Sequence, residues 1–320
     1  MLQGAKEGRN LVFPEALRKG DKIAIVSPAS CVKEEFVAGA VVRLLERGYN
    51  PVVMPHATNC VDGSYAAPLQ DRLQDITEAI LDKDVKAILC ARGGYGCVHL
   101  LSGLPAEMIA LNPKWIIGFS DVSALHALWL TAGVASIHGP MAKHLATEPA
   151  DDLYTEALFN ILESGGEFDY TVSSLRHTGE GSWRGILRGG NLAVLNGLAG
   201  TPYDTLNVKD NEDVILFFED ISEPIYAVER MLMRLYYTGS LQRAKGLIFG
   251  QFTDYKPDRN HENMEEMIFK LLSRLGIIDR IPVVSGFPTG HVKENYPVTE
   301  GARVELEIGP GNVRLRSVPN

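Results

Sequence analysis

Ser120 stands at the joint between a predicted strand and a predicted helix, within the stretch "WIIGFSDVSALHALWL". Such a joint lifts a side chain out of the sheet and aims the first N–H groups of the helix beside it, where they can stabilise an oxyanion. Serine and aspartate are also among the best helix N-caps. The usual hydrolase elbow G-x-S-x-G matches only in part, because its trailing position holds Val122. On these residues alone, a nucleophile and a helix cap are both open.

A serine nucleophile needs a neighbouring base, and the chain has 8 histidines. His291 is our first choice, because it follows an apolar strand and a Pro/Gly turn, "IPVVSGFPTG". His138 in "IHGP" is the second choice and His56 in "MPHA" the third, since both also follow strands. His126 lies inside the predicted helix after Ser120, so we expect it to be packed or on the surface.

Glu219 is the candidate for the acid that orients the histidine, because it directly follows the apolar run "VILFF". A carboxylate in that position is costly to bury without a partner. Capping the next helix is the alternative role, which Asp220 and Glu223 also fit. The chain order serine, acid, histidine is that of α/β-hydrolases, but triads arise on unrelated folds, so order alone proves little.

The glycine turn "RGGYG", residues 92–96, also follows a predicted strand. Clustered glycines let a backbone approach a ligand and expose its N–H groups. The turn lacks the G-x-G-x-x-G spacing of a dinucleotide site, and the chain has no P-loop motif. We interpret it as a source of oxyanion-hole donors beside the Ser120 loop, with a plain tight turn as the alternative. No H-E-x-x-H motif or Cys/His cluster occurs, so no metal site is expected.

In the first half of the chain, predicted strands alternate with predicted helices, and these elements must position the candidate residues. Strands are expected at "KIAIV", "NPVV", "VKAILCA", "KWIIG" and "VASIH", with helical patterns between them. This order predicts a parallel sheet covered by helices. The alternation of strand and helix patterns stops over residues 145–183. We therefore place a domain boundary at 168, which gives domains 1–168 and 169–320. The second half predicts a mixed α/β domain that ends in a hairpin across "GPG".

Bulk composition excludes several classes of protein. The 320 residues are 45% hydrophobic and 22% charged, which is typical of a globular chain. The net charge of −9 without a basic run argues against nucleic-acid and membrane-surface binding. No apolar run suits a signal peptide or a membrane span. The 4 cysteines form no CxxC pair and no dense disulfide framework, and we therefore expect a cytoplasmic protein.

The chain as a whole resembles the LD-carboxypeptidase family, serine peptidases that trim muropeptides. The resemblance covers nearly its full length and rests on seven segments in order: "GDKIAIVSPAS", "ARGGYG", "IIGFSDVSAL", "IHGPM", "GGNLAVLNGLAGTPY", "ILFFEDISEPIYAVERML" and "GHVKENYPV". Carried over by position, it implies that Ser120 is the nucleophile, Glu219 the acid and His291 the base. The fold implied is a flavodoxin-like or class I glutamine-amidotransferase-like N-terminal domain followed by a C-terminal α/β domain.

The resemblance also implies an oxyanion hole of two backbone N–H groups, which fall on Asp121 and a glycine of "RGGYG". We choose Gly94, with Gly93 as the alternative. No cofactor is expected. The implied reaction is hydrolysis of the L,D bond to the terminal D-alanine of a muropeptide tetrapeptide in cell-wall recycling, by an enzyme that is often a homodimer.

Substrate-binding residues are assigned from charge and position. Arg92 and Arg230 are candidates to bind a substrate carboxylate, and Tyr95 is a further candidate contact. The microcin-C immunity hydrolases are a sister branch that cleaves peptidyl-nucleotides and carries an aromatic platform, which Trp183 could mimic. Because the segment before "GGNL" is short, we favour the carboxypeptidase branch. A non-catalytic flavodoxin-like binding protein is the third hypothesis.

Overall fold

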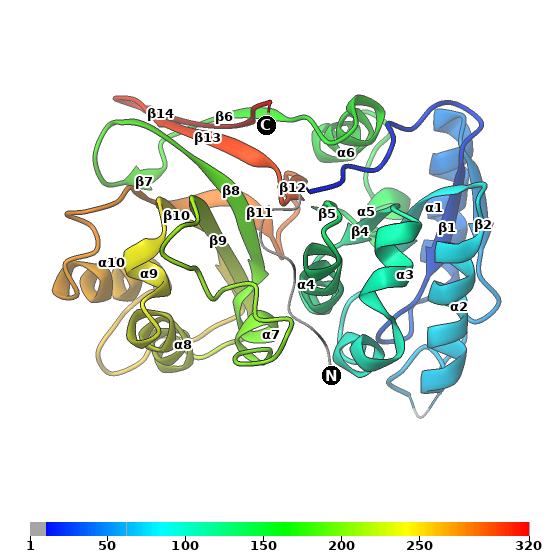
Figure 1. Ribbon diagram of the computed structural model, residues 1–320, viewed down its shortest axis with the longest axis horizontal. Coiled ribbons are helices and arrows are strands. Elements are labelled where there is room, and N and C mark those ends of the chain that lie inside the picture. Colours follow the sequence, from blue (N-terminus) through cyan, green and yellow to red (C-terminus); the bar gives the residue numbers. More distant parts are fainter. Residues whose placement is uncertain (1–10, 62, 320) are drawn as a thin grey trace. The chain divides into compact units, whose positions relative to one another are not determined.

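A computed structural model describes residues 11–61 and 63–319 (Figure 1). The described chain forms two compact units. The first contains the residues up to Gly166 together with Tyr296–Gly301, and the second contains the rest. Each unit has its own β-sheet, and the predicted α/β class is confirmed: the N-terminal sheet is mostly parallel, and the C-terminal unit is a mixed α/β domain. No helix in the described ranges has both the length and the apolar character needed to cross a membrane.

The sheet of the first unit has six strands in the order β12-β5-β4-β3-β1-β2. All neighbours pair in parallel except β12, which runs antiparallel to β5. The strands are short and nearly all buried apart from the edge strand β2, as expected of a parallel sheet covered on its faces. Their bounds are β1 Lys22–Val26, β2 Asn50–Val53, β3 Val85–Cys90, β4 Trp115–Gly118, β5 Ser136–His138 and β12 Val298–Glu300.

Helices lie between these strands and after β5. The first ends at Gly48, whose φ of 100° allows its N–H to bond the carbonyl groups of Leu44 and Leu45. The helix after Ser120 is buried along most of its length, which explains its apolar sequence. The bounds are α1 Glu34–Arg47, α2 Leu69–Leu81, α3 Ala106–Leu111, α4 Ser123–Ala132, α5 Ala142–Thr147 and α6 Leu153–Ser164.

The parallel part of this sheet has the flavodoxin-like order β2-β1-β3-β4-β5. In such sheets the strand order reverses between β1 and β3, and ligands bind at the carboxyl ends of the strands there. The loop that contains Ser30 follows β1, the loop that contains Gly93 follows β3, and Ser120 follows β4. The topology therefore brings these three loops to one edge of the sheet.

The second unit is built on an eight-stranded mixed sheet in the order β6-β14-β13-β8-β9-β10-β11-β7. Its centre, β8 to β11, is parallel, and β13 and β14 form the predicted hairpin. The strands are β6 Asp169–Ser173, β7 Arg176–His177, β8 Gly181–Asn191, β9 Val214–Ile221, β10 Gly246–Thr253, β11 Val283–Gly290, β13 Arg303–Ile308 and β14 Asn312–Ser317. The helices are α7 Leu192–Asn196, α8 Ile225–Tyr237, α9 Ser240–Arg243 and α10 Met264–Arg274.

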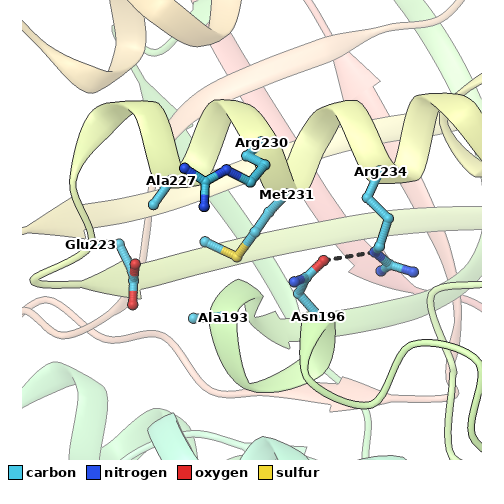
Figure 2. A pocket seen from close by; sticks show the side chains of 7 residues that line it. All are labelled: Ala193, Asn196, Glu223, Ala227, Arg230, Met231 and Arg234. Atoms are coloured by element: carbon cyan, nitrogen blue, oxygen red, sulfur yellow. Dashed lines mark hydrogen bonds between the residues drawn. The ribbon is translucent and has the colours of Figure 1, made fainter.

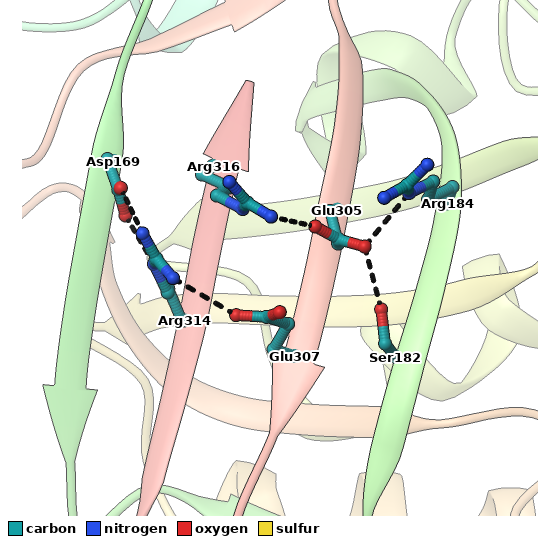
Figure 3. Close-up of polar contacts among 7 residues, drawn as sticks. All are labelled: Asp169, Ser182, Arg184, Glu305, Glu307, Arg314 and Arg316. Atoms are coloured by element: carbon teal, nitrogen blue, oxygen red, sulfur yellow. Dashed lines mark hydrogen bonds and ion pairs between the residues drawn. The ribbon is translucent and has the colours of Figure 1, made fainter. Parts of the chain in front are cut away.

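Charged side chains tie the antiparallel strands of this sheet together (Figure 3). The carboxylate of Glu305 on β13 accepts hydrogen bonds from Ser182 at 3.0 Å and from Arg184 Nε at 2.9 Å, both on β8, and it also pairs with Arg316 on β14. The hydrogen bond from Arg184 and the other partners lower the pKa of Glu305 to about 2. The carboxylate therefore stays ionised and links three strands over the whole neutral range.

The cysteines differ from expectation in one respect. The cysteine pattern predicts no dense disulfide framework and no particular pair, whereas the structure joins Cys31 to Cys60, whose Cα atoms lie 5.1 Å apart. The two residues are 29 positions apart in the chain, and only the fold brings their loops together. Cys90 is buried in β3.

Candidate active site

Ser120 lies in a strained turn immediately after β4. Its φ is 65°, one of four positive values among the described non-glycine residues. A serine in this region costs roughly 1–3 kcal/mol, and such strain concentrates at functional sites. The Ser120 and Asp121 side chains cap neither the short 3₁₀ helix Ser120–Val122 nor α4. The Asp121 carboxylate instead accepts a hydrogen bond from Cys97 N at 2.8 Å, so the capping role considered for this joint is not what the structure contains.

The glycine turn after β3 packs directly against Ser120. A Cβ placed on Gly93 would lie 2.8 Å from Ser120 Cβ and 3.3 Å from Asp121 N, so only glycine fits there. A Cβ on Gly94, whose φ is 106°, would collide with Ser30 Oγ at 2.3 Å. Within residues 11–61 and 63–319, no acceptor is bonded to the N–H of either glycine. Both amides are therefore available as donors, and Gly93 is the one in contact with Ser120.

Residues 30–31, after β1, support the glycine turn from its other side. Ser30 N donates to Gly93 O at 3.2 Å, and Ser30 Oγ accepts from Tyr95 N at 3.2 Å. The Arg92 guanidinium donates to the Cys31 carbonyl at 2.7 Å. Arg92 and Tyr95 are both exposed. The two predicted substrate contacts thus flank the turn, with Arg92 partly engaged by the backbone.

Glu219 and His291 form a hydrogen-bonded pair in the second unit. Glu219 lies near the carboxyl end of β9 and is fully buried, and His291 directly follows β11. The distance from His291 Nδ1 to Glu219 Oε2 is 2.6 Å. A carboxylate bound to Nδ1 fixes the imidazole tautomer and orients Nε2 as the basic atom. This is the geometry expected of the orienting acid and the base of a triad.

Two glycines that sequence reasoning missed make this pair possible. The strand β10 lies between β9 and β11, and a Cβ on Gly250 would lie 2.6 Å from Thr289 O. A Cβ on Gly290, at φ 117°, would lie 2.8 Å from both Cβ and Oε2 of Glu219. The buried Asn295 accepts from Gly290 N at 2.9 Å and thereby holds the His291 loop. The only signal in the sequence is glycine at each of these two strand positions.

The negative charge of Glu219 shifts the pKa of His291. Burial alone would lower the pKa of His291, but the hydrogen bond and the negative charge of Glu219 outweigh it and raise the pKa above its usual value. Burial, followed by the charge of Glu219, raises the pKa of Asp220 to about 7. Asp220 accepts from Asn191 Nδ2 at 3.0 Å and from Ala193 N at 2.8 Å, so it anchors the start of α7.

The other candidate histidines lie in the first unit. His56 binds Asp75, with 2.8 Å between Nδ1 and Oδ1. His126 and His138 are buried, with ring centroids 6.1 Å apart, and together with Glu300 they place one possible ligand atom each within 4.8 Å of one another. Both nitrogens of His126 are already engaged at 2.9 Å, by Ser136 Oγ and by the Gly118 carbonyl. A metal ion would have to break one of these bonds, so packing is the role that the contacts support.

The remaining predicted residues lie in the second unit. Arg230 is exposed on α8, and its guanidinium lies 5.5 Å from the centre of the Tyr226 ring. Trp183 is part of β8, opposite Leu306 of β13, and is half-buried. The structure therefore places Ser120, Asp121 and the glycine turn in one unit, and the acid–base pair and Arg230 in the other.

Comparison with known families matches both halves of the chain. Residues 23–139 match the model of an LD-carboxypeptidase N-terminal domain, and residues 184–306 match that of an LD-carboxypeptidase C-terminal domain. The candidate nucleophile falls in the first match, and the acid–base pair falls in the second.

Relatives cover nearly the whole chain. A probable murein peptide carboxypeptidase of Bacillus subtilis is 33% identical over 92% of this chain and 91% of its own length. The crystal structure of a muramoyltetrapeptide carboxypeptidase from Oxalobacter formigenes, 32% identical, superposes with a TM-score of 0.81 over 93% of this chain and 99% of that one. The microcin C7 self-immunity protein of Escherichia coli is 25% identical over 93% of this chain and 94% of its own length.

Proposed function

Because the chain belongs to the LD-carboxypeptidase family and is a serine-type carboxypeptidase, we propose that it removes the terminal D-alanine from muropeptide tetrapeptides. The observation that carries the proposal is the 2.6 Å hydrogen bond between His291 Nδ1 and the buried Glu219, which prepares a base for a serine. The strained turn at Ser120 supplies that serine. The bond cleaved is the L,D bond between the third residue and D-alanine, in the recycling of cell-wall peptides.

The mechanism assigns one role to each group. His291 accepts the proton of Ser120 as the hydroxyl attacks the scissile carbonyl, and Glu219 stabilises the imidazolium that forms. His291 then donates this proton to the leaving D-alanine amine, and water hydrolyses the acyl-enzyme. In this proposal residues 1–168 contribute the nucleophile, and residues 169–320 contribute the acid and the base.

The oxyanion would be held by backbone donors at the Ser120 turn. Asp121 N is one donor, and a glycine of the turn after β3 is the other. Gly94 is the donor first expected, but the close packing of Gly93 against Ser120 supports Gly93 equally. Each donor of this kind contributes about 3 kcal/mol to transition-state stabilisation.

The proposal also covers the substrate contacts, the location of the enzyme and its oligomeric state. Arg92 and Tyr95, on the exposed side of the glycine turn, are proposed substrate contacts in the first unit, and Arg230 is one in the second. A muropeptide taken up for recycling would meet the enzyme in the cytoplasm. We also propose that the enzyme is a homodimer, which sedimentation of the purified protein would test.

The direct test is incubation with a disaccharide tetrapeptide followed by mass spectrometry. We expect the loss of one alanine from the peptide, no product with Ser120→Ala, and covalent labelling of Ser120 by a serine-directed phosphonate. An unlabelled serine and unchanged turnover in Ser120→Ala would contradict the mechanism.

A second candidate is hydrolysis of a peptidyl-nucleotide amide, which the resemblance to the microcin C7 self-immunity protein favours. Incubation with an aminoacyl sulfamoyl adenosine separates the two. Turnover of the adenosine compound alone would favour the second function. Turnover of the tetrapeptide alone would favour the first.

A further inference from the structure

Arg72 is a buried cation whose hydrogen bonds go to the backbone of the first unit. It lies in the first turn of α2 and is 3% exposed. Its Nη1 donates to Pro28 O at 2.7 Å and to Gly96 O at 3.1 Å, and its Nε donates to Ala67 O at 3.0 Å. Pro28 follows β1, and Gly96 ends the glycine turn after β3. One guanidinium therefore joins the start of α2 to two loops at the carboxyl edge of the sheet.

The burial of Arg72 distinguishes it from arginines that are available to a ligand. Arg230 and Arg234, on α8 of the second unit, line a cavity of about 470 Å³ (Figure 2). Arg234 Nε donates there to a side chain, Asn196 Oδ1, at 2.7 Å. Arg72 has almost no exposed surface, and its hydrogen bonds with the described residues all go to backbone carbonyls. These contacts indicate that Arg72 positions the chain and does not bind substrate.

Asp121 holds the same peptide group from its other side. It is 4% exposed, and its carboxylate accepts a hydrogen bond from Cys97 N at 2.8 Å. Gly96 O and Cys97 N belong to one peptide group, so a cation bonds its oxygen and an anion bonds its N–H. Hydrogen bonds to ionised groups are roughly twice as strong as neutral ones. Burial lowers the pKa of Arg72 and raises the pKa of Asp121, and the charge of each residue opposes the shift of the other.

The segment that ends at this peptide group has little to fix its conformation by itself. Three of the five residues 92–96 are glycines, and φ is 106° at Gly94 and 132° at Gly96. Glycine adopts many backbone conformations, whereas an oxyanion hole works only when its N–H donors are held in place beforehand. A Cβ on Gly96 would lie 2.8 Å from Arg72 Nη1, so glycine also admits the guanidinium. External contacts must therefore fix the turn.

We propose that Arg72 and Asp121 are positioning residues, which hold the Gly96–Cys97 peptide group and thereby fix the glycine turn against Ser120. The inference rests on the proposed function, because the position of the turn affects the reaction only if Ser120 is the nucleophile. Asp121 then contributes twice. Its N–H is one proposed oxyanion donor, and its carboxylate fixes the turn that carries the other.

The first test replaces Arg72 by methionine, which keeps an apolar side chain and removes the guanidinium. With the disaccharide tetrapeptide, kcat and kcat/KM should fall together by ~10²-fold or more, as when an oxyanion donor is lost. Labelling of Ser120 by a serine-directed phosphonate should slow in parallel, because the phosphonyl oxygen occupies the same hole. Calorimetry should show that Arg72→Met does not change the affinity of Ser120→Ala for the tetrapeptide. An unchanged kcat, or a loss confined to binding, would overturn the inference.

Asp121 provides a second test, which does not require an Arg72 variant to fold. Asp121→Asn keeps an acceptor for Cys97 N, so it should retain at least ~10-fold more kcat than Asp121→Ala. Arg72→Met and Asp121→Ala remove two contacts to one peptide group, so the double variant should lose less kcat than the product of the two single losses. Equal kcat in Asp121→Asn and Asp121→Ala, or multiplicative losses in the double variant, would contradict the positioning role.

Lys114→Met is the matched control, because Lys114 occupies an equivalent position at the opposite edge of the same sheet. Lys114 is also buried, and its Nζ donates to the carbonyl groups of Asp82 and Val85 near the start of β3. Both methionine variants should lower the midpoint of urea unfolding, but only Arg72→Met should lower kcat. An equal loss of kcat in Lys114→Met would show that reduced stability alone explains the effect, and the positioning role would fail.

The phosphonate separates this inference from the proposed function, because it reports on Ser120 without the peptide substrate. If the wild type cleaves no tetrapeptide but its Ser120 is labelled faster than that of Arg72→Met, the proposed function fails and the positioning role stands. If the wild type and Arg72→Met cleave the tetrapeptide at equal rates, the proposed function stands and the positioning role fails.

Discussion

At the scale of single residues, His291 carries the pH dependence of the proposed reaction. Its burial favours the neutral ring, whereas Glu219 at 2.6 Å favours the cation, and the second effect is larger, so the pKa is raised. Asp220 and Asp254 act in the same direction as Glu219. The imidazole accepts a proton only when it is neutral, so the reaction needs a pH above this raised pKa.

We therefore expect kcat/KM to rise with pH with a midpoint above 6.5, the ordinary value of the histidine pKa. In Glu219→Gln the charge is lost while burial remains, so the pKa falls and the acid limb moves to lower pH. Activity should also fall by about 10²–10⁴-fold, as when the orienting acid of a triad is replaced. The pH profile of kcat/KM measures both effects.

Asp254→Asn is the comparison for this experiment, because its charge acts on His291 without a hydrogen bond to it. Its acid limb should move less than that of Glu219→Gln. If the acid limb of the kcat/KM profile of Glu219→Gln lies at the same pH as that of the wild type, a group other than His291 controls the pH dependence.

At the scale of elements, the contact between the glycine turn and the Ser120 turn sets the proposed oxyanion hole. Gly93 has no positive φ, so alanine suits its backbone, but the added Cβ would lie 2.8 Å from Ser120 Cβ. Gly93→Ala should push the two turns apart and misplace the donors. We expect kcat/KM to fall by about 10²-fold or more, with a loss of about 1–3 kcal/mol in the free energy of unfolding.

Gly311→Ala is the matched control, because Gly311 also lacks a positive φ and an added Cβ there meets nothing within 4 Å. It should keep both activity and the free energy of unfolding. An active Gly93→Ala enzyme would show that the donors do not depend on this contact.

Individual elements and their ends could be predicted from the sequence, whereas the contacts between elements could not. A polar residue after an apolar run identifies a strand end, and in this way Ser120, Glu219 and His291 were located with the elements that carry them. The approach of Glu219 to His291 across β10 depends on Gly250 and Gly290 and on the order of strands in the sheet, and the pattern within a single segment does not show which strands become neighbours. The Cys31–Cys60 disulfide was missed for the same reason.

At the scale of the whole molecule, the chain leaves the first unit at Gly166 and returns to it for Tyr296–Gly301. This return places β12 beside β5, where Val298 is 2% exposed and Thr299 Oγ1 donates to Gly166 O at 2.8 Å. Periodicity predicts a terminal hairpin but cannot show that the residues just before it pair with the other sheet. The first unit is therefore incomplete until the last part of the chain is present.

This discontinuity predicts how fragments behave. A fragment that ends at residue 166 lacks β12, so β5 becomes an exposed sheet edge, which favours aggregation. Appending residues 296–301 through a short glycine–serine linker should raise the free energy of unfolding by roughly 2–5 kcal/mol, from burial of Val298 and the restored hydrogen bonds. Urea unfolding of the two fragments measures the difference, with a fragment bearing the same six residues in scrambled order as the control. Equal midpoints for all three would mean that the first unit is complete without β12.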